Sequence, residues 1–71
     1  MEARDIRREL AADGFMSVHE AELFSGLKKS KLYALMAAGE LPYARIGAAR
    51  RIPKRALIEF LARNIVLRNA E

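Results

Sequence analysis

Apolar residues near the start of the chain recur at a helical spacing. Ile6 and Leu10 lie four residues apart within residues 3–12, and the residues around them favour a helix. Asp13 and Gly14 then interrupt the pattern. The sequence therefore predicts a short helix with a narrow apolar stripe.

A second helix is predicted from Ser17 to the residue before Gly26. Ser17 followed three residues later by Glu20 is the capping-box pattern of a helix start. This helix is expected to bury Ala21 and Phe24. Gly26 is expected to adopt a left-handed conformation, which ends the helix in a tight turn.

The third stretch, residues 28–38, has two faces of different chemistry. On a helical wheel, Leu32, Leu35 and Met36 gather on one side, which predicts a buried stripe. Gly39 is expected to close this helix. The opposite side carries small and polar residues: Ser30, Tyr33, Ala34 and Ala37.

After this helix the pattern changes to that of a hairpin. Leu41-Pro42 cannot continue a helix, and residues 43–46 and 50–52 predict two short strands around a small tip at residues 47–49. Arginines lie close to this tip.

A fourth helix is predicted behind the hairpin, with Pro53 in its first turn. Its apolar residues at helical spacing are Leu57, Phe60, Leu61 and Ile65. The phenylalanines of the chain, Phe15, Phe24 and Phe60, are assigned with the leucines to the core rather than to a surface for base stacking.

Together these elements predict a mainly α fold with a small β-hairpin, a winged helix-turn-helix. It consists of a helix-turn-helix, a two-stranded wing, a C-terminal helix and an extra N-terminal helix. At 71 residues the chain has room for one domain. We expect an N-terminal helical extension over residues 1–14, the winged helix-turn-helix domain over residues 15–64 and an apolar C-terminal tail over residues 65–71.

Charge is distributed unevenly along the chain, whose formal net charge is +4. Residues 1–25 carry a net −3 and residues 56–71 are neutral, whereas residues 26–55 carry eight basic side chains against Glu40, a net +7. Such a stretch attracts a polyanion because each neutralised phosphate releases condensed counterions. The charge is equally consistent with a solvated surface that binds no polyanion. The arrangement of the basic residues is therefore needed to distinguish these two interpretations.

Composition argues against several classes of protein. Without cysteine the chain has no disulfide and no thiolate metal site, and His19 is expected to be a surface helix residue rather than a metal ligand or a general acid–base group. The longest apolar run has seven residues, against roughly 20 for a membrane span, and the first ten residues contain no signal-peptide stretch. We expect a cytoplasmic binding protein that is not an enzyme and uses no cofactor, metal or membrane.

A series of short motifs adds a family resemblance. They are SVHEA at residues 17–21, SGL at 25–27, SKLY at 30–33, GELPYARIG at 39–47 and RIP at 51–53. With these motifs in this order, residues 16–63 resemble the excisionase-type DNA-binding domains, whose fold is related to the MerR-like winged helix.

The resemblance implies that the partner is double-stranded DNA, that the protein is associated with the nucleoid, and that no small-molecule effector is involved. It places Lys29 and Ser30 at base edges or nearby phosphates, Tyr33 at the DNA backbone, and Arg45, Arg50 and Arg51 in the wing, where they would contact phosphates or the minor groove. Of the neighbours Arg50 and Arg51, only one needs to face a groove; Arg50 is favoured because it is nearer the tip. The full set of expected DNA-binding residues is Lys28, Lys29, Ser30, Lys31, Tyr33, Arg45, Arg50, Arg51 and Lys54.

One departure from the family pattern concerns the start of the helix predicted over residues 28–38, which corresponds to the family's recognition helix. Lys28 stands where the family has a helix-capping serine, and this change is expected to weaken the cap by about 1 kcal/mol unless another group replaces it.

The implied function is that of an excisionase, which binds and bends DNA and so directs integrase-mediated excision. A small transcriptional regulator and the DNA-recognition subunit of a phage packaging complex use the same domain, and the sequence does not separate these roles. The alternative from a different class is a protein-interaction module. An integrase is one candidate protein partner, and a second copy of the chain is another, through Ile6, Leu10, Ile65, Val66 and Leu67.

Overall fold

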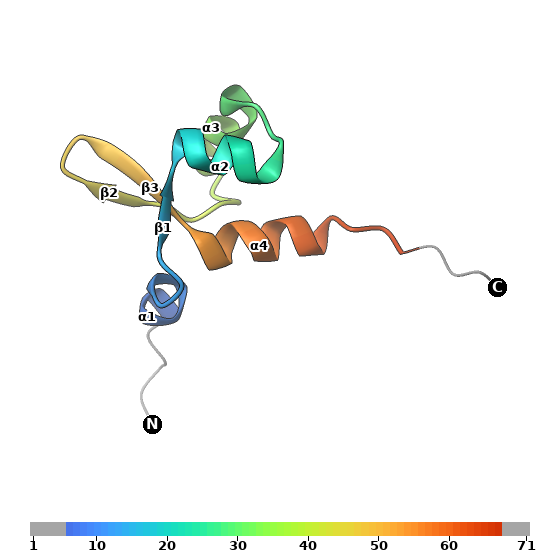
Figure 1. The fold of residues 1–71 in the computed structure, drawn as a ribbon, viewed down its shortest axis with the longest axis horizontal. Coiled ribbons are helices and arrows are strands. Elements are labelled where there is room, and N and C mark those ends of the chain that lie inside the picture. Colours follow the sequence, from blue (N-terminus) through green and yellow to red (C-terminus); the bar gives the residue numbers. More distant parts are fainter. Residues whose placement is uncertain (1–5, 68–71) are drawn as a thin grey trace.

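The computed structural model describes residues 6–67. Its elements are α1 (Ile6–Ala11), β1 (Phe15–Ser17), α2 (Val18–Ser25), α3 (Lys29–Ala37), β2 (Ala44–Ile46), β3 (Ala49–Pro53) and α4 (Lys54–Arg63). The hairpin of β2 and β3 and the helix α4 extend in opposite directions from the centre of the molecule, with α2 and α3 together on one side (Figure 1). The predicted winged helix-turn-helix is thus confirmed for the described residues.

The start of α2 follows directly from the Ser17–Glu20 pair. The Ser17 hydroxyl accepts a hydrogen bond from the Glu20 amide at 3.0 Å, and the Ser17 amide donates to Glu20 Oε1 at 2.9 Å. These two bonds form the predicted capping box. At the other end, Gly26 has a φ of 79° and donates its N–H to the Glu22 carbonyl, which confirms the predicted left-handed turn.

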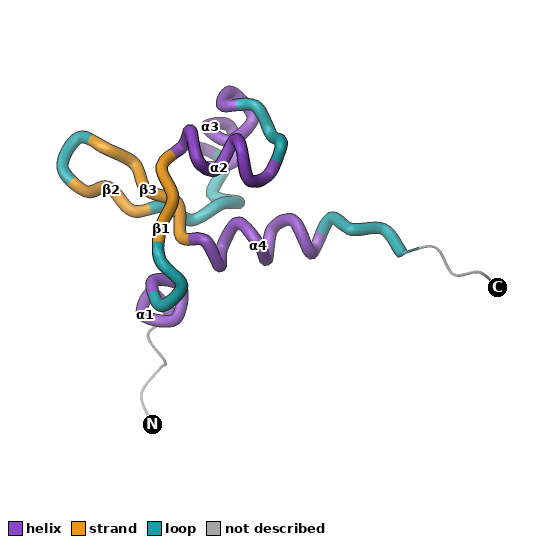
Figure 2. Tube along the Cα trace, viewed as in Figure 1, coloured by secondary structure: helices purple, strands orange, loops and turns teal. Residues whose placement is uncertain are grey.

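The wing differs from the prediction in two respects: Ala49 belongs to β3 rather than to the tip, and the sheet has one more strand. Phe15–Ser17 forms β1, which pairs antiparallel with β3, so the sheet has three strands in the order β1-β3-β2. Figure 2 shows these short strands meeting at the centre of the molecule, with a small turn at the hairpin tip. The added strand ties the start of α2 to the wing through the pairing of Ser17 with Arg51.

The core lies between the sheet and the helices α2, α3 and α4. Leu32, Leu35 and Met36 form the buried stripe of α3, as predicted, and Leu32 is fully buried. The other buried residues of the core are Val18, Ala21, Leu41, Ile52, Ala56 and Leu57.

The assignment of phenylalanines to the core is wrong at two of three positions. Phe24 is 50% exposed and Phe15 is 40% exposed, whereas Phe60 is half-buried and packs against the core. The inner face of α2 carries Val18, Ala21 and the half-buried Ser25, which leaves Phe24 at the side of the helix. The leucines also include two surface residues, because Leu23 is 72% exposed and Leu67, in the C-terminal tail, is 85% exposed.

The two ends of the described chain behave differently. Leu10 of α1 packs against the core, whereas Ile6 is exposed. The fourth helix ends at Arg63, where the Asn64 side chain donates a hydrogen bond to the Phe60 carbonyl at 2.8 Å. Ile65 therefore lies beyond the helix and is exposed, in contrast to the predicted helical pattern.

Candidate nucleic-acid interface

The first turn of α3 gathers basic side chains at an uncapped helix end. Lys28, Lys29 and Lys31 are all exposed, as is Ser30. Lys28 is the N-cap residue and makes no side-chain cap bond, which confirms the expected loss of the cap. The backbone amides of a helix start carry partial positive charge and favour anions. The three lysines and the backbone amides of the helix start together make the N-terminal end of α3 strongly electropositive.

The outward face of α3 is open and built from small or polar residues. Tyr33, Ala34 and Ala37 are exposed together with Ser30, while the opposite stripe of the helix is buried. Short side chains on the exposed face allow the helix backbone to approach another surface closely. The arrangement suits a helix that enters the DNA major groove, whose width admits one α-helix.

The hairpin that forms the wing has a two-residue tip. Ile46 pairs with Ala49 across Gly47 and Ala48, and Gly47 has a φ of 63° while no other residue type in the described chain has a positive φ. A glycine at the first position of such a turn matches the twist of the flanking strands. The tip is therefore narrow, with exposed Arg45 one position before Ile46.

Arg50 is placed differently from the exposed position that its closeness to the tip predicts. It is half-buried, and its guanidinium carbon lies 5.2 Å from the ring centroid of Tyr33 and 4.8 Å from that of Tyr43. Arg50 is paired with Arg45 across the hairpin, so both side chains leave the same face of the sheet. That face looks toward α3, and the Arg50 guanidinium is stacked on Tyr33 of α3 instead of extending freely into solvent.

The Arg51 side chain extends from the opposite face of β3 and therefore has different neighbours from Arg50. It is half-buried, and its Nη1 contacts the Arg50 carbonyl at 3.4 Å. The Ser17 backbone amide, aided by the Ser17 hydroxyl and the charge of Arg51, holds the pKa of the Glu20 carboxyl below its ordinary value. Of the two arginines, Arg51 is thus the one that lies near an acidic residue.

Lys54 stands apart from the other predicted residues. It begins α4 at the end of β3 that is remote from the hairpin tip, and its backbone amide donates to the Gly14 carbonyl at 2.9 Å. The next residue, Arg55, donates from Nε to Asp13 Oδ2 at 2.9 Å, and this hydrogen bond raises the pKa of the Arg55 guanidinium. This end of the sheet is therefore anchored to the α1–β1 segment.

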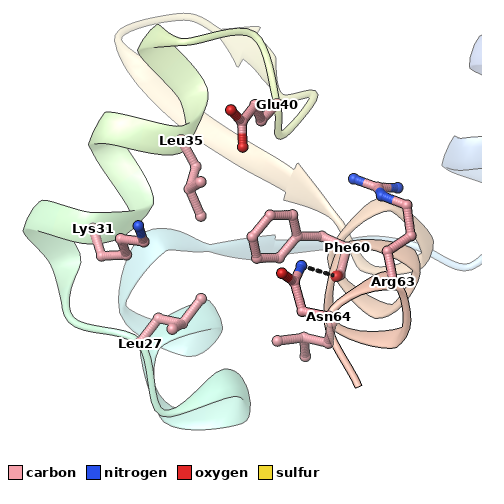
Figure 3. Close-up of a pocket in the computed structure, with 8 residues that line it drawn as sticks. Leu27, Lys31, Leu35, Glu40, Phe60, Arg63 and Asn64 are labelled. Atoms are coloured by element: carbon pink, nitrogen blue, oxygen red, sulfur yellow. Dashed lines mark hydrogen bonds between the residues drawn. The ribbon is translucent and has the colours of Figure 1, made fainter. Parts of the chain in front are cut away.

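An open depression of about 520 Å³ lies between α3 and α4. Figure 3 shows Leu27 and Leu35 on one side and Phe60 on the other, with Lys31 and Arg63 at the rim. Lys31 is thus at the border between the outward face of α3 and this depression.

Tyr43 belongs to this surface although it is not among the predicted DNA-binding residues. It precedes β2, and continuing the hairpin register places it diagonally across from Arg50. That register was a signal in the sequence, because the tip Gly47-Ala48 fixes which residues oppose one another. From the sequence alone, Tyr43 is expected only as a residue of the strand.

Two further observations concern other chemistry. His19 is exposed on α2, as predicted, and no cluster of three or more histidine, aspartate or glutamate side chains suited to a metal ion occurs within residues 6–67. Among the same residues, no helix has the length and apolar character needed to span a membrane.

An electropositive helix with an open face, a tight turn before it and a basic hairpin beside it define a winged helix-turn-helix protein. The chain belongs to the helix-turn-helix domain family, whose model matches residues 15–65. It is 41% identical over 63 residues to a probable excisionase of Saccharopolyspora erythraea. That alignment covers 89% of this chain and 64% of the relative, so the chain spans less than two thirds of the relative's length. No solved structure matches the chain.

Proposed function

We propose that this protein is an excisionase that binds duplex DNA with α3 in the major groove and the hairpin at the adjacent minor groove. The observation that carries the proposal is the placement of Lys28, Lys29 and Lys31 at the start of α3, beside a hairpin that carries Arg45 and Arg50. Positive charge on both elements matches the phosphates that border the two grooves. The similarity to a probable excisionase supports this role over a transcriptional or packaging role.

The proposed activity is binding and bending rather than catalysis. A helix in one groove and a wing at the next contact the duplex over more than one face, and bending the DNA increases such contact. Excision itself requires strand cleavage, which an integrase would perform on the DNA that this protein shapes.

Deletion of the gene in its own cell tests the excisionase role. Quantitative PCR across the rejoined chromosomal site should show loss of excision, while integration continues. Complementation with the wild-type chain should restore excision, and complementation with Lys29→Ala should restore it poorly. Unchanged excision in the deletion strain, together with altered transcription near the bound sites, would contradict the excisionase role and favour a regulator.

We also propose self-association through the apolar ends of the chain. Val66 is 82% exposed and Leu67 is 85% exposed, and Ile6 and Ile65 are exposed as well. Leu10 contributes less than the sequence suggests because it packs against its own core. An interface would remove these side chains from water and link neighbouring copies on DNA.

Sedimentation of the full chain at about 100 µM tests this part of the proposal. The wild type should associate, whereas the double variant Val66→Ser, Leu67→Ser should sediment as a monomer. Val66 and Leu67 lie outside the core, so the substitutions should leave the melting temperature unchanged. A monomeric wild type, both free and on DNA, would disprove self-association.

A further inference from the structure

The most unusual contact of this surface is the stacking of one wing arginine on two tyrosines. The Arg50 guanidinium lies 4.8 Å from the Tyr43 ring centroid and 5.2 Å from that of Tyr33, both within the range of a cation–π interaction. Tyr33 comes from α3, and Tyr43 comes from the segment before β2. The arginine therefore connects the wing to the recognition helix.

This placement is not explained by attraction to an acidic residue. Arg50 faces Arg45 across the hairpin, and like charges directly opposite each other in a sheet repel. Within residues 6–67 the Arg50 guanidinium forms no hydrogen bond and no ion pair. In contrast, Arg55 is paired with Asp13. The two aromatic rings are what hold the Arg50 side chain in place.

A guanidinium that is stacked on two rings keeps its N–H donors available for a hydrogen-bond acceptor outside the protein. Its planar faces suit stacking on the rings, and its N–H donors lie around the edge of the plane, where they can bind two oxygens of one anion. The side chain is half-buried and already ordered, so less conformational entropy is lost when an anion binds than with a free surface arginine.

The position of Arg50 selects the part of DNA that it meets. It lies between the outward face of α3 and the hairpin, because it contacts Tyr33 of the helix and belongs to β3. If α3 occupies the major groove and the hairpin the adjacent minor groove, the sugar–phosphate strand that separates these grooves passes between the two elements.

We propose that Arg50 is a phosphate-binding residue of the DNA backbone and that Tyr43 is a positioning residue that holds it, together with Tyr33. This inference rests on the proposed DNA-binding function. It assigns Arg50 a sequence-independent role and leaves exposed Arg45 as the arginine nearest the minor groove. It also makes the distance between helix and wing a fixed property of the free protein.

A double-mutant cycle on DNA binding tests the proposal, with affinities measured by fluorescence anisotropy on one duplex selected for tight binding. Arg50→Ala should weaken binding about tenfold and reduce the salt slope by about one, with the same factor on duplexes altered at single base pairs. Tyr43→Leu should weaken binding about threefold in the wild type and should have no further effect in the Arg50→Ala background.

Matched variants control for other causes. Tyr43→Phe keeps the ring and should bind as the wild type does. Arg55→Ala also removes one positive charge, but its guanidinium is paired with Asp13, so it should change the salt slope little. Titration with DNA at a concentration far above Kd gives the active fraction of each variant, which separates a weaker contact from partial unfolding.

Several results would overturn the proposal. Equal effects of Tyr43→Leu in both backgrounds would show that Tyr43 does not act through Arg50. A loss in Arg50→Ala that is confined to one base pair would make Arg50 a base-reading residue. Both outcomes would leave DNA binding itself intact, as the loss caused by Lys29→Ala would show. Absence of any DNA binding by the wild type would instead contradict the proposed function and this inference together.

Discussion

Replacement of Gly26 by alanine is expected to destabilise the protein through backbone conformation alone. Gly26 ends α2 with a φ of 79° and a ψ of 1°, and a Cβ added to it would meet no atom within 4 Å. Crowding therefore contributes nothing. A left-handed conformation costs an L-residue about 1–2 kcal/mol, so we expect a loss of about 1 kcal/mol in the free energy of unfolding. In a domain of this size that loss lowers the melting temperature by about 4–8 °C.

Urea unfolding of the wild type, Gly26→Ala and a chemically synthesised chain with D-alanine at this position separates conformation from packing. The D-residue favours positive φ and should be at least as stable as glycine, because it also restricts the unfolded chain. The slope of the unfolding free energy against urea should be the same for all three proteins. Equal destabilisation by L-alanine and D-alanine, or a Gly26→Ala variant as stable as the wild type, would show that the left-handed backbone at Gly26 does not limit stability.

Three further predictions concern the α2 cap, the Arg55 ion pair and the basic start of α3. The lowered pKa of Glu20 means that its stabilising effect is present near neutral pH and is lost as the pH falls, so Glu20→Gln should reduce the drop in melting temperature between about pH 5 and pH 3. A drop as large as that of the wild type would contradict this role. Asp13→Ala breaks an exposed pair and should shift the urea midpoint only slightly, whereas a large shift would show that the pair is not merely a surface contact. Lys29→Ala should leave the melting temperature unchanged and make the salt slope of DNA binding shallower by about one, whereas an unchanged slope would remove Lys29 from the interface.

Local rules of the sequence were sufficient to predict α2 and the buried stripe of α3. The Ser17–Glu20 capping box and Gly26 define the limits of α2 because each acts within one helical turn. The buried stripe of α3 also follows from spacing alone, since Leu32, Leu35 and Met36 share a face of any helix in that stretch.

Features that depend on contacts between distant segments were not predictable in this way. The three residues of β1, Phe15–Ser17, are too few to show the alternation of apolar and polar residues that is typical of a strand. They form a strand because they pair with β3. The exposure of Phe24 likewise depends on which side of α2 meets the core.

The position of Arg50 shows the same limit within the site itself. Its neighbour Tyr43 belongs to the same hairpin, but Tyr33 belongs to α3, and only the packing of wing against helix brings the three side chains together. The sequence was sufficient to predict which basic residues form this surface. The orientation of their side chains could be determined only from the tertiary structure.

Selection of bound duplexes from a random DNA pool at near-physiological salt, followed by sequencing, tests sequence-specific DNA binding directly. Sequencing should return an enriched motif, and the affinity for that motif should fall steeply as salt rises from about 50 to about 200 mM. Failure of the full chain to bind any duplex, even at the lowest salt, would show that the protein does not bind DNA through α3 and the hairpin.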